Sequence, residues 1–154
     1  MTPLVLADPP SWRGAANARN LTSAALRMTY RLQPHGAHHV GTSGALLMVT
    51  RSEAVLAGSV LRALAPRPIH VVAKAAMSQA VPLGVLTAAG DVPLSGPYAV
   101  TTQRSVLAAL LDERAVVLAG SAVPVGYLVA LTGVAVMPVV LFGAEGKVAT
   151  DPPR

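Results

Sequence analysis

The stretch AVVLAGSAVPVGYLVALTGVAVMPVVLFGA, residues 115–144, decides the fold, because it runs for thirty residues without a charge. Its length exceeds the roughly 20 apolar residues that span a bilayer as one helix. Two prolines and four glycines divide it, however, into strand-length runs at 115–119 and 135–142 and a helix-length run at 125–133. Apolar strands joined by a short helix are typical of a parallel sheet buried on both faces, so we expect Val117 and Val139 to be buried. A small integral membrane protein with one spanning helix stays open as an alternative.

The rest of the chain alternates strands and helices in the same way. The patterns predict a helix that begins at Leu21, a loop over residues 33–44, strands at 45–50, 68–73 and 91–94, and helices at 53–64, 75–88 and 102–113. This order predicts an α/β fold, a mostly parallel sheet flanked by helices. We expect one such domain over residues 21–147, with an N-terminal arm at 1–20 and a C-terminal tail at 148–154.

The composition indicates one folded core and a basic surface. Of the 154 residues, 53% are hydrophobic and 12% are charged, which excludes disorder over most of the chain. The absence of cysteine excludes a disulfide scaffold, a thiolate metal site and a Cys nucleophile. The formal charge of +5 arises in the N-terminal half, which favours an anionic partner such as a phospholipid surface. The few aromatic residues leave little for base stacking, so we expect no nucleic acid partner.

Two features of the N-terminal half bear on location. The start, MTPLVLADPPSWRG, has Asp8 and prolines where a secretory signal needs a cationic and then an apolar segment, so we expect a cytoplasmic chain. Arg27 and Arg31 share one helix face, with Arg13 and Arg19 nearby, as in a basic amphipathic edge that contacts the inner face of a membrane. A solvated face on a small basic domain explains the same arginines equally well.

The spacing of the predicted elements carries a family resemblance. GALLMVTRSEAVLAGSVLRALAPRPIHVVAK, residues 44–74, resembles the opening of the glycerolipid acyltransferase domain, which acylates glycerol phosphate and lysophosphatidic acid. The following segments resemble that family's later motifs in unbroken order over about residues 24–145: PLGVLTAAGDVPLSG, SVLAALLDERAVVLAGS and LTGVAVMPVVLFG. The resemblance implies the family's α/β fold and a protein that faces lipid.

The catalytic residues of that family are missing from this chain. Its reaction uses a His as base and an Asp, five positions later, that orients the imidazole. The resemblance places the His position on Ser52 and the Asp position on Ala57, and only Glu53 could act as a base nearby. The family's phosphate-binding motifs are replaced by VPLSG at 92–96 and LAGSA at 118–122. The positions that the resemblance leaves for substrate binding are Arg51, Lys74, Gly120, Ser121 and Pro138.

Histidines are further candidates for catalysis or metal binding. His38 and His39, with His35 before them, could place two imidazoles on one metal, but no carboxylate accompanies them and exposed loop histidines are the more common case. We therefore expect no metal and no cofactor. His70 lies in an apolar strand, where a hydrogen-bonded sheet residue is the expected role.

Two functions follow from these observations. The first is a divergent, non-catalytic relative of the glycerolipid acyltransferases that binds a lipid, an acyl group or a protein partner, which can be a second copy, at a membrane face. The second is an active acyltransferase that moves an acyl group from acyl-CoA or acyl carrier protein to a hydroxyl acceptor through a rearranged site. In the second case His38, His39 or Glu53 would act as the base, with Ser52 or Ser121 assisting.

Overall fold

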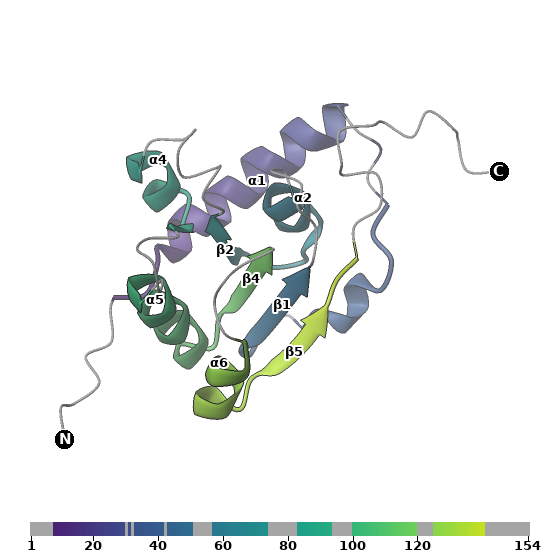
Figure 1. Cartoon of the computed structure of the whole chain (residues 1–154). Coiled ribbons are helices and arrows are strands. Elements are labelled where there is room, and N and C mark those ends of the chain that lie inside the picture. The colour runs from purple at the N-terminus through teal and green to yellow at the C-terminus, as the bar shows by residue number, and fades with distance from the viewer. Residues whose placement is uncertain are drawn as a thin grey trace, which may run out of the picture.

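The described strands form a single parallel sheet with helices on both faces (Figure 1). The computed structural model describes residues 8–29, 31, 33–41, 43–50, 57–73, 83–93, 100–119 and 125–140. The strands are β1 (Leu46–Thr50), β2 (Ile69–Ala73), β3 (Val92–Pro93), β4 (Ala115–Ala119) and β5 (Ala135–Pro138). Their order in the sheet is β3-β2-β4-β1-β5, and every described pair is parallel. The α/β fold expected from the sequence is confirmed.

The helices alternate with the strands as the apolar pattern predicts. They are α1 (Trp12–Thr29), the 3-10 helix η1 (Ala37–His39), α2 (Ala57–Leu64), α4 (Leu83–Ala88), α5 (Val100–Leu111) and α6 (Val125–Thr132). In Figure 1, α1 and α2 lie behind the sheet, whereas α5 and α6 lie in front of it. None of the helices over these residues is long and apolar enough to cross a membrane. The apolar run 115–144 therefore does not form a spanning helix over its described part, residues 115–119 and 125–140.

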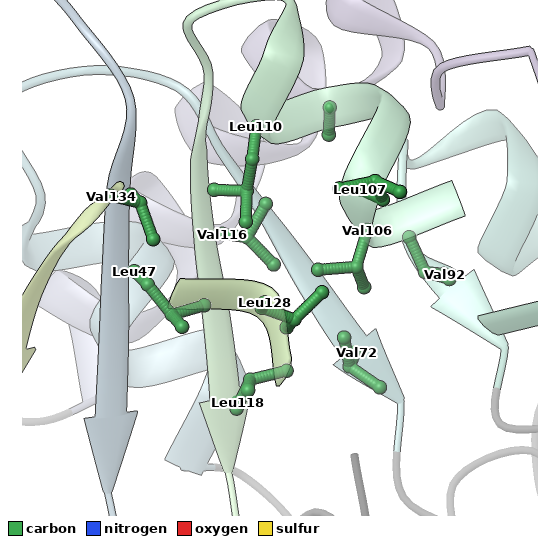
Figure 2. Close-up of a cluster of buried hydrophobic side chains, with 11 residues drawn as sticks. Leu47, Val72, Val92, Val106, Leu107, Leu110, Val116, Leu118, Leu128 and Val134 are labelled. Atoms are coloured by element: carbon green, nitrogen blue, oxygen red, sulfur yellow. The ribbon is translucent and has the colours of Figure 1, made fainter. Parts of the chain in front are cut away.

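Alternation along the central strands divides the core into two clusters. Leu47, Val116 and Leu118 point to the face covered by α5 and α6, where Val106, Leu110 and Leu128 pack against them (Figure 2). Leu46, Met48 and Val117 point to the opposite face, toward Leu61 of α2. Val117 is fully buried, as expected. Because both faces of β1 and β4 are covered, both strands are apolar at nearly every position.

The sequence expectation for β5 is wrong in one respect. A strand buried on both faces was expected over residues 135–142, but β5 is an edge strand and its described side chains are exposed or half-buried. Val136 is 43% exposed, and Val139 after the strand is only half-buried. The Val139 N–H still donates to the Val49 carbonyl at 2.8 Å, so the ladder with β1 extends one residue past Pro138. An apolar run alone does not distinguish a central strand from an edge strand.

The first helix begins at Trp12 and not at Leu21, so part of the expected N-terminal arm belongs to the packed domain. Ala15 is fully buried, and α1 packs along α2. A Cβ atom at Gly14 would lie 2.1 Å from the Ala88 carbonyl oxygen, so only glycine lets α1 approach the end of α4 so closely. Gly90, just beyond α4, has a φ of +74°. A Cβ atom there would lie 2.5 Å from the Ser11 carbonyl oxygen and 2.8 Å from the Ala15 nitrogen, so this side of the contact also requires glycine.

Candidate functional site

The carboxyl ends of β1 and β4 lie side by side in the middle of the sheet, with Thr50 in register with Ala119. The helix that follows β1 in the sequence, α2, lies on one face of the sheet, and the helix that follows β4, α6, lies on the other (Figure 1). In open α/β sheets, ligands bind outside the carboxyl ends of the strands at such a change of direction. This edge of the sheet is therefore the first place to look for a site.

Most of the site residues expected from the sequence fall outside the described residues. Arg51, Ser52 and Glu53 follow Thr50 of β1 in the sequence, Lys74 follows Ala73 of β2, and Gly120 and Ser121 follow Ala119 of β4. Their strands are neighbours in the order β2-β4-β1. Two of the positions that the resemblance assigns are described: Ala57 is the first residue of α2, and Pro138 is the last residue of β5, in register with Val49.

His38 and His39 lie next to the edge strand. Both are exposed and belong to η1, and their ring centroids are 4.0 Å apart. In Figure 1, η1 lies beside β5, and Val40 directly after it joins the core cluster against which Met137 and Val139 pack. The pair therefore does not lie between β1 and β4. Within the described ranges, no group of three or more His, Asp or Glu side chains could hold a metal ion.

A buried polar cluster lies near the start of β2. His70 is fully buried, and its Nδ1 is 2.7 Å from the Gly90 carbonyl oxygen. Its Nε2 is 3.3 Å from Nη1 of Arg114, which also donates to the Pro10 carbonyl. A carbonyl can only accept and a guanidinium can only donate, so His70 is the neutral tautomer with its proton on Nδ1. The expectation of a hydrogen-bonded sheet histidine is confirmed.

The ring of Trp12 completes this cluster and links it to α1. Its ring centroid is 6.2 Å from that of His70, and the Arg114 guanidinium carbon lies 5.7 Å from the Trp12 ring. Asp112 pairs with Arg114 at 2.7 Å and is more than half exposed. Every polar contact of His70 is thus to a main-chain oxygen or to a cation, and no described carboxylate reaches the imidazole by hydrogen bonding. Such a histidine anchors loops, because both of its ring nitrogens contact groups of the protein.

Two more buried arginines join distant parts of the chain. Arg62 of α2 pairs with Asp91, just before β3, with both side chains nearly buried. Burial lowers the pKa of Arg62 to about 10. Arg67 donates to the carbonyls of Gly44 at 2.8 Å and Glu113 at 3.1 Å, so it joins the loops that lead into β1 and β4. Sequence reasoning missed both arginines as structural groups, because their partners are far away in the chain.

The stability of the protein should fall as pH is lowered from about 6.5 toward 4. Burial, with Arg114 and Arg62 nearby, lowers the pKa of His70 from 6.5 to about 4, although the Gly90 carbonyl and Asp112 oppose this. Between these values the unfolded chain binds a proton that the folded chain does not, so stability is fully present above the higher pKa and is lost below it. The loss approaches about 3 kcal/mol near pH 4.

Urea unfolding at several pH values would measure this dependence, with a His70→Gln variant as the control. The variant should be less stable at pH 7 and should have a flatter profile between pH 4 and 6.5, because Gln does not titrate. The same slope in both proteins would assign the acid sensitivity to other groups.

Comparisons with protein-family models, curated proteins and solved structures find no match for the chain. The resemblance to the glycerolipid acyltransferases therefore rests on the motif order in the sequence alone.

Proposed function

We propose that this protein is a divergent, non-catalytic relative of the glycerolipid acyltransferases that binds a lipid or acyl group, or a protein partner, at the inner face of a membrane. The observation that carries the proposal is the adjacency of β1 and β4. In the acyltransferase resemblance, the catalytic motif follows the first of these strands and the phosphate-binding motif follows the second. Their adjacency supports one shared site at the carboxyl edge of the sheet.

The absence of catalysis is inferred from the residues that follow these strands. Residues 49–58, VTRSEAVLAG, contain neither His nor Asp, and LAGSA after β4 has no charge to bind a phosphate. A general base must come within hydrogen-bond reach of the hydroxyl group that it activates. His38 and His39 lie beside β5, separated by β1 from β4, and His70 is buried and bonded through both ring nitrogens. These positions support the proposal that no described histidine replaces the missing base.

A site that has lost the charges of the phosphate motifs, and keeps Arg51 and Lys74 as its cationic positions, still has the chemistry to bind an acyl group. The chain keeps Gly120 and Ser121 in the sequence after β4, and these residue types supply backbone N–H groups and a hydroxyl in place of the lost charges. Small-molecule sites of this kind are mainly apolar, with few polar groups that fix orientation. The proposal therefore favours the acyl part of a lipid over its phosphate as the bound group.

The decisive experiment is a thioester-release assay on the purified protein, with long-chain acyl-CoA and either glycerol phosphate or lysophosphatidic acid. A native mass spectrum of the same sample reports any co-purified lipid or partner. We expect no turnover above the buffer rate, together with a lipid or partner adduct in the spectrum.

Alanine variants identify the alternative, an active enzyme with a rearranged site. Turnover that falls by orders of magnitude in His38→Ala, His39→Ala or Glu53→Gln, but not in His35→Ala, would overturn the proposal. His35 is the matched control because it is exposed in the same loop. A protein with neither turnover nor any adduct would also contradict the proposed binding function.

A further inference from the structure

One face of α1 combines exposed apolar side chains with positive charge. Leu21 is 75% exposed and Met28 is 89% exposed, which are high values for side chains of this size. The exposed residues on this face are Arg13, Asn17, Asn20, Leu21, Ala24, Arg27 and Met28. Their spacing of three or four residues places them along one side of the helix, which we call the outer face of α1.

The charge on this face has a single sign. The sequence of α1, WRGAANARNLTSAALRMT, contains three arginines and no acidic residue. Arg19 turns toward the domain and donates to the Ala65 carbonyl at 2.8 Å, which leaves Arg13 and Arg27 on the outer face. Arg31, just after the helix, is also exposed. Arginines beside protruding aliphatic side chains are the pattern by which amphipathic helices bind anionic lipid surfaces.

The other exposed apolar side chains of the described residues have fewer arginines on their helices: α5, with Val100 and Leu111, carries Arg104 alone. Tyr127 and Leu131 on α6 are each nearly half exposed, but α6 has no charged residue to select a partner. On α1, by contrast, the cations and the aliphatic groups lie on the same surface. The aromatic residue of α1, Trp12, is engaged with the His70 and Arg114 cluster, so the described residues of this face offer no other aromatic ring on which a nucleic acid base could stack.

The direction of α1 brings this face toward the proposed lipid site. The helix begins near His70, in the first half of β2, because the rings of Trp12 and His70 are 6.2 Å apart. It continues for 18 residues, or about 27 Å. In Figure 1 its far end lies on the side to which the arrowhead of β1 points. Arg27 and Met28 thus lie on the same side of the molecule as the carboxyl edge of the sheet.

We propose that the outer face of α1 docks the protein on an anionic phospholipid surface, an inference that rests on the proposed function and names the surface that makes the membrane contact. Arg13 and Arg27 attract the anionic headgroups, and Leu21 and Met28 insert among the acyl chains. Docking in this orientation holds the carboxyl edge of the sheet close to the lipid.

Vesicle sedimentation tests the proposal with the full chain. We expect the protein to sediment with vesicles of equal phosphatidylcholine and phosphatidylglycerol, and to stay in solution with phosphatidylcholine alone. Binding should weaken strongly at about 1 M salt, where the Debye length is about 3 Å. Reversing both charges in Arg13→Glu/Arg27→Glu should weaken binding at least about tenfold, since each basic group near the surface contributes separately.

Matched variants separate this face from general charge and hydrophobicity. Arg104→Glu changes an exposed arginine on α5, and Leu111→Ser removes a 53% exposed leucine at the end of α5. Both should bind like the wild type, whereas Leu21→Ser/Met28→Ser should bind more weakly. Thermal melting checks that every variant stays folded.

Three outcomes would overturn the inference. The first is that the folded wild-type protein fails to sediment with anionic vesicles, and the second is that Arg104→Glu loses as much binding as Arg13→Glu/Arg27→Glu. The third outcome is that single-stranded RNA displaces the vesicles by binding to the same arginines. Lipid adducts are measured separately by native mass spectrometry. A protein that carries lipid but does not sediment would therefore keep the proposed lipid binding and lose this inference alone.

Discussion

Replacing Val117 by Asp is expected to leave no folded protein at 25 °C. Val117 is fully buried in β4, which lies between β2 and β1, and it faces the apolar cluster beneath α2. An uncompensated carboxylate there costs several kcal/mol, which is comparable to the total stability of a small domain, about 5–15 kcal/mol. Circular dichroism should show no cooperative melting transition, and the protein should elute as an expanded chain or aggregate.

The control is Val136→Asp in the edge strand. Val136 is 43% exposed, so its carboxylate can remain in water and the variant should melt close to the wild type. A Val117→Asp protein that melts like the wild type would contradict the burial of β4 on both faces. Loss of folding in both variants would show that β5 is covered in solution.

The second large effect is expected at the ion pair between Arg62 and Asp91. Their side chains are only 6% and 11% exposed, and Nε of Arg62 has no hydrogen-bond partner among the described residues. Asp91→Ala leaves the buried guanidinium without its counter-charge, which should cost about 3–5 kcal/mol of unfolding free energy. Urea titration at pH 7 measures the loss.

Two further variants show whether burial causes this cost. Asp112→Ala also removes a carboxylate from an arginine, but Asp112 is 56% exposed, so it should cost less than about 1 kcal/mol. The double variant Arg62→Met/Asp91→Ala should recover much of the stability lost in Asp91→Ala, because a buried ion pair is often replaceable by apolar groups. Equal losses in Asp91→Ala and Asp112→Ala would exclude a special role for burial.

The order of strands and helices could be predicted from the sequence, because each element carries its own apolar pattern. The strands 46–50, 69–73 and 115–119 lie within a residue of the expected ranges. The start of α1 was missed because WRGAANARN has glycine, asparagine and little apolar periodicity. What holds this segment in place is tertiary, namely the contact between Gly14 and the end of α4, and no local pattern reveals it.

The candidate site could be predicted only as positions in the sequence. The motif alignment assigns Ser52 to the segment after β1, Ala57 to the start of α2, and Gly120 and Ser121 to the segment after β4. The strand order shows that β1 and β4 are neighbours. The buried polar clusters could not be predicted in this way. Arg62 and Asp91 are 29 residues apart, and Arg114 and Pro10 are 104 residues apart, so only the fold brings them together.

Pro138 sets a limit on how far the sheet can grow. Because Val139 directs its N–H toward Val49, the neighbouring position 138 faces away from β1, toward the open side of the edge strand. Proline has no backbone N–H. A strand added from another molecule could therefore donate to the Pro138 carbonyl but could not accept a hydrogen bond from Pro138. A strand from another molecule should therefore add poorly at Pro138, the residue that the resemblance also assigns to substrate binding.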